Sequence, residues 1–165
     1  MNILLTGESG VGKSEIIKRV LARTDVNAGG MLTEFVNREQ DDRQLFMMDL
    51  QREVSLEVVS FRLGHSPKAN VEVFNDFGSE LIEKAKEYDL AIVDELGFFE
   101  NNAGKFKSAL FDLLADEMDV LGVIKLDYRG WLEDIRARED VNIITVTPEN
   151  RDEMPEYIIG LLGLA

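Results

Sequence analysis

A glycine-rich segment near the start of the chain ends in a lysine and a serine, and it directly follows a short apolar run. Residues 7–14 read Gly-Glu-Ser-Gly-Val-Gly-Lys-Ser, after the run Ile-Leu-Leu-Thr of residues 3–6. This order satisfies the pattern G-x-x-x-x-G-K-[ST], whose glycines let backbone N–H groups approach a phosphate without an intervening side chain. The spacing therefore predicts a phosphate-binding loop between a strand and a helix. The residues expected to bind phosphate are Gly7, Glu8, Ser9, Gly10, Val11, Gly12, Lys13 and Ser14.

The last two residues of this loop carry most of its chemistry. Lys13 offers a positive charge to the β- and γ-phosphates of a nucleotide. Ser14 offers a hydroxyl to Mg²⁺, an ion that keeps several waters and binds through few protein oxygens. The positive end of the following helix dipole adds to the attraction for anions. We therefore expect a nucleotide, ATP or GTP, bound together with Mg²⁺.

A second group of reactive side chains follows the apolar run of residues 90–93. Here the chain reads Leu-Ala-Ile-Val and then Asp94 and Glu95. In open α/β sheets ligands bind at the carboxyl ends of the strands, so this acid pair is expected beside the loop. Phosphoryl transfer needs a carboxylate for Mg²⁺ and a group that orients the attacking water. We assign Asp94 and Ser14 to the metal, and Glu95 and Lys13 to catalysis.

The elements that must position these side chains alternate between apolar strands and amphipathic helices. Polar residues 51–53 separate two β-like runs at 43–50 and 54–61, which predicts a hairpin. The alternation predicts one domain over residues 1–165, an α/β three-layer sandwich with a mostly parallel sheet and an antiparallel hairpin insert. Further strands are expected at 31–36, 90–94, 120–126 and 141–146, and helices at 13–23, 74–88, 106–114, 131–136 and from Pro155 to Leu164.

Composition excludes several classes of function. The net charge of −14 repels nucleic acids and anionic membranes, whose binding depends on Lys and Arg. The absence of cysteine excludes disulfides and thiolate metal sites and favours a cytoplasmic location. No apolar run approaches the roughly 20 residues of a membrane span, and no signal peptide is expected because Met1-Asn2 leads directly into the first strand. A nucleoside triphosphate is thus the expected partner, while a protein partner and the oligomeric state stay open.

Five segments together resemble the family of small P-loop nucleoside triphosphatases, which hydrolyse ATP, GTP and other nucleotides. The resemblance extends nearly from end to end, and the pairing of Asp-Glu-Leu-Gly with a later Thr-Pro-Glu-Asn-Arg-Asp is its most specific part. It implies the P-loop NTPase fold, the reaction of NTP and water to NDP and phosphate with Mg²⁺, and the roles assigned above to Lys13, Ser14, Asp94 and Glu95. The matching segments are residues 7–14, 30–36, 70–74, 93–97 with Glu100, and 147–152.

The chain departs from this family directly after the acid pair. The family usually carries a basic residue after the glycine of this segment, whereas Phe98 and Phe99 stand here before Glu100. The sequence therefore predicts that a positive group near the phosphates is missing, and it leaves the rate open. Arg151, in the last matching segment, is the candidate transition-state cation. The arginines weighed for that role are Arg129, Arg136, Arg138 and Arg151.

Two other classes of function remain open from the sequence. Asp94-Glu95-Leu96-Gly97 also satisfies the D-x-x-G pattern of a GTPase-like switch. The guanine-reading motif N-K-x-D is incomplete at Lys125-Leu126-Asp127, because Ile124 stands where the motif requires Asn. A nucleotide-binding adaptor with little activity of its own is the second alternative. Glu95 favours hydrolysis, because a carboxylate that activates water suits an enzyme that works alone.

Overall fold

A single eight-stranded sheet forms the centre of the molecule in the computed structural model, which describes residues 1–164. The strands lie in the order β5-β4-β3-β2-β6-β7-β1-β8. Strands β2, β6, β7, β1 and β8 run parallel to one another, and β3, β4 and β5 continue the sheet antiparallel from β2. The strand bounds are β1 (Asn2–Thr6), β2 (Ala28–Val36), β3 (Arg43–Asp49), β4 (Ser55–Phe61), β5 (Lys68–Ala69), β6 (Leu90–Leu96), β7 (Asp119–Ile124) and β8 (Val141–Thr145).

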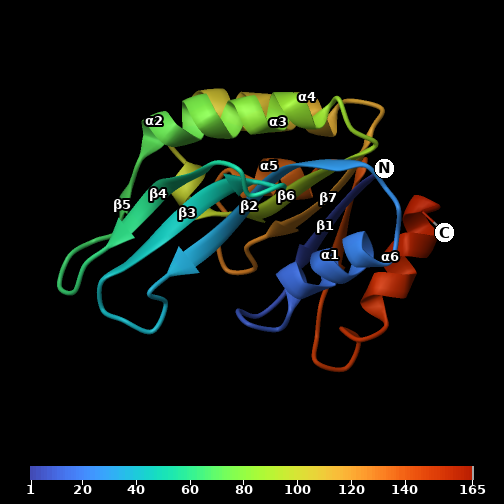
Figure 1. The fold of residues 1–165 in the computed structure, drawn as a ribbon, viewed down its shortest axis with the longest axis horizontal. Helices are drawn as coiled ribbons and strands as arrows, with labels where there is room; N and C mark the ends of the chain where they lie inside the picture. The colour runs from blue at the N-terminus through green and yellow to red at the C-terminus, as the bar shows by residue number, and fades with distance from the viewer. Residues whose placement is uncertain (165) are drawn as a thin grey trace.

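Helices cover both faces of the sheet, so the molecule has three layers (Figure 1). One face packs against α3, α4 and α5, and the other packs against α1 and α6. Parallel strands buried on both faces need continuous apolar runs, and residues 90–93 and 120–124 are such runs. The helix bounds are α1 (Lys13–Ala22), α2 (Val71–Val73), the π-helical turn η1 (Phe74–Gly78), α3 (Ser79–Ala85), the 3₁₀ turn η2 (Phe98–Glu100), α4 (Gly104–Leu114), α5 (Leu132–Arg136) and α6 (Met154–Leu162).

The predicted fold class is confirmed, including the hairpin insert. Strands β3 and β4 pair antiparallel from Arg43 with Phe61 to Met48 with Ser55. Figure 1 shows this hairpin and β5 extending the sheet away from the edge at which both chain termini lie. The insert therefore adds to one side of the sheet without interrupting the parallel strands that lead to the predicted site.

Several elements differ from the sequence-based expectation, including the strand expected at 120–126, which ends at Ile124. Strand β2 starts at Ala28, because Gly30 lets its backbone pass so close to Ile92 of β6 that an added side chain would collide there. The helical segment expected at 74–88 instead covers 71–85, starting after Asn70, whose side chain accepts a hydrogen bond from the Val73 N–H. Strand β5 was not expected, since two residues are too few for a pattern.

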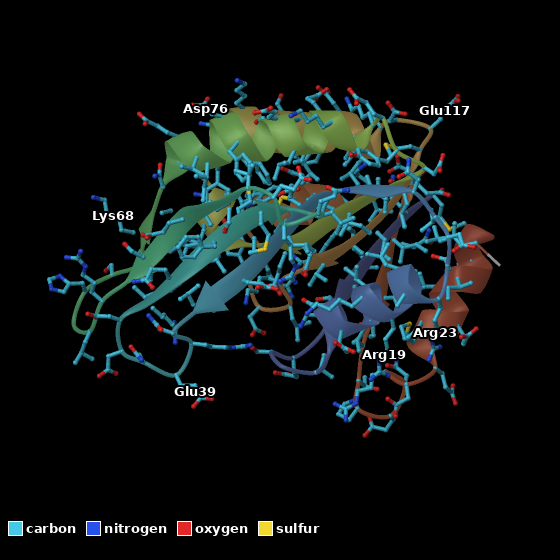
Figure 2. The ribbon with its side chains drawn as sticks, viewed as in Figure 1. Arg19, Arg23, Glu39, Lys68, Asp76 and Glu117 are labelled. Atoms are coloured by element: carbon cyan, nitrogen blue, oxygen red, sulfur yellow. The ribbon has the colours of Figure 1, made fainter. Side chains whose placement is uncertain are left out.

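Charged side chains surround the sheet and its helical layers. Figure 2 shows Asp76 and Glu117 beside the helical layer of α3 and α4, and Arg19 and Arg23 near α1 and α6. Within residues 1–164, no helix is both long enough and apolar enough to cross a membrane.

Candidate active site

The phosphate-binding loop connects β1 to α1, as the sequence predicts. Gly7 has a φ of 146°, and a Cβ atom added there would lie 2.5 Å from the carbonyl oxygen of Val146. Gly12, directly before α1, has a φ of 112°. L-residues rarely adopt such angles, so glycine is required at both positions. The loop therefore turns tightly into α1 and brings its backbone to the edge of the sheet.

Lys13 lies folded back over this loop. Its Nζ donates hydrogen bonds to the carbonyl oxygens of Gly7, at 2.8 Å, and Glu8, at 2.9 Å. The residue is only 8% exposed, and burial lowers the pKa of its ammonium, against the opposing attraction of the Glu95 carboxylate. Two backbone carbonyls thus hold a nearly buried positive charge at the mouth of the loop, where it is available to an anionic ligand.

Asp94 is buried next to the serine of the loop. It is 3% exposed, and its Oδ1 has no hydrogen-bond partner among residues 1–164. Burial raises the pKa of this carboxyl to about 6, although the Ser14 hydroxyl acts in the opposite direction. A buried carboxylate oxygen without a partner is costly unless it contacts a cation. The Asp94 carboxylate and the Ser14 hydroxyl are therefore a donor pair that fits Mg²⁺.

Glu95 lies at the same edge, paired with a lysine from the neighbouring strand. Its Oε1 is 2.8 Å from the Nζ of Lys125, and its side chain is 25% exposed. Lys125 directly follows β7, and its backbone N–H donates to the carbonyl oxygen of Leu96 at 2.9 Å. The Glu95 carboxylate consequently has the Lys125 ammonium at ion-pair distance and keeps partial access to solvent.

Buried hydrogen bonds brace the segment after the acid pair. The Gly97 N–H donates to Oε2 of Glu100 at 3.0 Å, and the Trp131 indole N–H donates to the Gly97 carbonyl at 2.9 Å. Glu100 is 3% exposed, and its burial raises the pKa of its carboxyl to about 7. These contacts tie the end of β6 to the chain that follows β7.

Arg151 lies on the other side of the phosphate-binding loop. Its Nη1 donates to the carbonyl oxygen of Val11 at 3.4 Å, and its Cδ is 4.0 Å from the position of a Cβ at Gly12. The other three candidates for the transition-state cation contact acidic neighbours. Arg129 and Arg136 pair with Glu133, and Arg138 pairs with Asp140.

The structure thus brings four predicted residues to one edge of the sheet and adds one that the sequence analysis missed. Lys13, Ser14, Asp94 and Glu95 meet there, while the role of Arg151 stays a prediction. The absence of a positive group near the phosphates stays a prediction, although Lys125 places an ammonium beside Glu95. A usable signal was present: Lys125 follows an apolar run, and parallel strands end at the same edge as Asp94.

Comparison with known proteins identifies the family. The family model described as NTPase matches residues 2–159. The chain belongs to this family. It is 32% identical to the nucleoside-triphosphatase THEP1 of Thermotoga maritima over 98% of this chain and 95% of that protein. The corresponding protein of Aquifex aeolicus is 28% identical, with 98% and 99% covered.

Two solved structures share the fold of this NTPase family member. The crystal structure of THEP1 from Aquifex aeolicus matches with a TM-score of 0.82 at 27% identity, covering 98% of this chain and 99% of that one. The solution structure of a human cancer-related nucleoside triphosphatase matches with a TM-score of 0.74 at 21% identity, covering 98% and 96%. At that identity the human protein supports the fold alone. The mostly parallel sheet with its antiparallel part is therefore the architecture of the family.

Proposed function

We propose that this chain is a Mg²⁺-dependent nucleoside triphosphatase that converts NTP and water to NDP and phosphate. The observation that carries the proposal is the buried Asp94 carboxylate beside Ser14, whose Oδ1 has no hydrogen-bond partner in the described residues 1–164, at the edge where Lys13 and Glu95 also lie. A glycine-rich turn alone needs none of these groups. Relatives named nucleoside-triphosphatase, including one 32% identical over nearly the whole chain, support the same reaction.

The loop and its lysine would bind the phosphates. The backbone N–H groups of residues 7–14 and the positive end of the α1 dipole would surround the β-phosphate. Lys13 would release the carbonyls of Gly7 and Glu8 and donate to phosphate oxygens instead. Asp94 and Ser14 would hold Mg²⁺, which neutralises charge on the β- and γ-phosphates. This local set of positive charges is what allows a chain of net charge −14 to bind a polyanion.

Glu95 would activate the attacking water. Its carboxylate would accept one proton as the water oxygen bonds to the γ-phosphorus and the bond to the β,γ-bridging oxygen breaks, leaving NDP. Its side chain is 25% exposed, so solvent water can reach it. General-base catalysis of this kind contributes roughly 10²–10⁴-fold in rate.

Phosphate release tests this proposal. We expect the wild-type chain to release phosphate from ATP, GTP, CTP or UTP with Mg²⁺, and to lose that activity when Mg²⁺ is removed with a chelator. Glu95→Gln should lower kcat about 100-fold or more while nucleotide affinity by calorimetry stays within a few fold. Glu117→Gln, the same change on the exposed surface, is the matched control (Figure 2). Undiminished phosphate release by the Glu95 variant would overturn the assignment.

A further inference from the structure

The strand order places Lys125 in the middle of the candidate active site. Strand β7 lies between β6, which carries Asp94 and Glu95, and β1, which leads into the phosphate-binding loop. All three strands are parallel and end at the same edge of the sheet. The first residue after β7 therefore emerges between the acid pair and the loop, and that residue is Lys125.

The Lys125 side chain extends toward Glu95 across the backbone of Gly97. A Cβ atom added at Gly97 would lie 2.9 Å from Cγ of Lys125, so the lysine stem packs directly against this glycine. Its Nζ then reaches Oε1 of Glu95 at 2.8 Å. A larger residue at 97 would obstruct this path, and the lysine reaches the carboxylate because the position is glycine.

The backbone that carries Lys125 is held at several points. Its N–H donates to Leu96, and its carbonyl oxygen accepts a hydrogen bond from the Arg136 guanidinium. Phe98, after the acid pair, packs edge-to-face on Tyr128, after β7, with ring centroids 5.4 Å apart. The main chain at 125 is thus fixed, while the side chain is 48% exposed, so its ammonium is not enclosed by protein.

Two lysines supply positive charge near Glu95, and a terminal phosphate would be attracted to that charge. Lys13 and Lys125 both lie near Glu95, and the Lys125 charge is felt at Lys13, where it lowers the pKa of the ammonium. Two ammonium groups therefore lie near the Glu95 carboxylate. Arg151 reaches the loop at Val11, and its segment follows β8, which lies beyond β1 and away from the acid pair.

We propose, on the basis of the nucleoside triphosphatase function above, that the Lys125 ammonium binds the terminal phosphate of the bound triphosphate. In the nucleotide-free chain it is paired with Glu95. A γ-phosphate carries more negative charge than a single carboxylate, so the flexible lysine transfers to the phosphate oxygens when a triphosphate enters. Glu95 is then released to accept the proton of the attacking water. A nucleoside diphosphate lacks that phosphate and leaves the pair intact.

The test compares triphosphate with diphosphate binding in Lys125→Met. Calorimetry is done with Mg²⁺ and the β,γ-imido analogues of ATP and GTP, and with Mg²⁺ and ADP or GDP. We expect the variant to bind the analogues about tenfold or more weakly, to bind the diphosphates within about twofold of wild type, and to lose at least tenfold in kcat. Lys125→Arg keeps the charge and should retain part of the difference. Lys105→Met is the control, because Lys105 is also exposed and lies 4.0 Å from Asp76 on the helical face.

Three results would overturn the inference. They are unchanged kcat in Lys125→Met, equal weakening of diphosphate and triphosphate binding, or the same defect in Lys105→Met. Lys125→Gln repeats the comparison with a polar neutral side chain should the Met variant not fold. Failure of the proposed function is distinguishable, because a wild-type chain that releases no phosphate would refute hydrolysis. The binding comparison needs no turnover and would still report on Lys125.

Discussion

At the residue scale, the burial of the Asp94 carboxylate is unfavourable for folding, yet it suits that carboxylate to bind a cation. Asp94 is almost fully buried, one of its oxygens has no partner within residues 1–164, and its carboxyl pKa is raised to about 6 by that burial. An isolated ionised carboxylate in this position destabilises the nucleotide-free fold. In the proposed function, binding of Mg²⁺ would reverse that effect, so stability and function would be opposed at this residue.

Asp94→Asn should separate the two effects. Asparagine has nearly the same shape and no charge, so the nucleotide-free variant should be more stable at pH 8 by about 1–3 kcal/mol, measured by urea denaturation. Phosphate release should fall about 100-fold or more, because a ligand to Mg²⁺ is lost.

Asp76→Asn, a change at an exposed position, is the control for both measurements. Hydrolysis by Asp94→Asn at the wild-type rate would remove Asp94 from the metal site.

At the element scale, the turn between β8 and α6 decides where Arg151 lies. The Asn150 side chain accepts from the Thr147 N–H at 2.8 Å and donates to the Thr145 carbonyl at 3.0 Å. The Asn150 N–H in turn donates to the Thr147 hydroxyl oxygen at 3.3 Å. Asparagine is favoured in such turns because its amide mimics backbone groups. The turn holds Arg151 against the Val11 carbonyl of the phosphate-binding loop.

Asn150→Ala should therefore weaken both the turn and nucleotide binding. The loss of the two hydrogen bonds that the Asn150 side chain makes should lower the free energy of unfolding by about 1–3 kcal/mol. With Arg151 displaced, KM for the nucleotide should rise several fold while kcat changes less, because this turn lies on the side of the loop remote from Glu95.

The control for this change is Asn27→Ala, an exposed residue directly before β2. An unchanged KM together with lowered stability would show that the turn supports folding alone.

At the scale of the whole molecule, the buried carboxyls of Glu100 and Asp94 make the free energy of unfolding depend on pH. Glu100 has a carboxyl pKa raised by burial from 4.5 to about 7, which is higher than in the unfolded chain. Between these values the native state binds more protons than the unfolded state, so stability falls as pH rises. The stabilising contribution is complete below pH 4.5 and is lost as the pH passes 7. Asp94 adds to this slope between 3.8 and about 6.

Glu100→Gln should flatten this dependence. Glutamine keeps an acceptor for the Gly97 N–H and has no charge to bury. The difference in unfolding free energy between the variant and the wild type should grow in favour of the variant from pH 5 to 7, at up to about 1.4 kcal/mol per pH unit.

Urea denaturation at pH 5, 6, 7 and 8 measures this difference directly. A constant difference across that range would show that the Glu100 carboxyl does not titrate there.

The local signals in the sequence determined much of this protein. The glycine spacing of residues 7–14 encodes the phosphate-binding loop, since positive φ angles at Gly7 and Gly12 exclude other residues. The apolar runs before Asp94 and within β7 encode buried strands, and the polar residues 51–53 encode the turn of the hairpin. Each of these features depends on neighbours along the chain, so a single sequence is sufficient to predict it.

Only the tertiary structure decided which distant residues share the site. Nothing local indicates that β7 lies between β6 and β1, yet this order brings Lys125 to Glu95 and leaves Arg151 on the far side of the loop. The resemblance indicated a missing basic residue at Phe98, and Arg151 was a separate candidate for a transition-state cation. Strand order results from the burial of whole strands and helices against one another. It therefore places Lys125 beside Glu95 and Arg151 beside Val11, a difference that local patterns do not show.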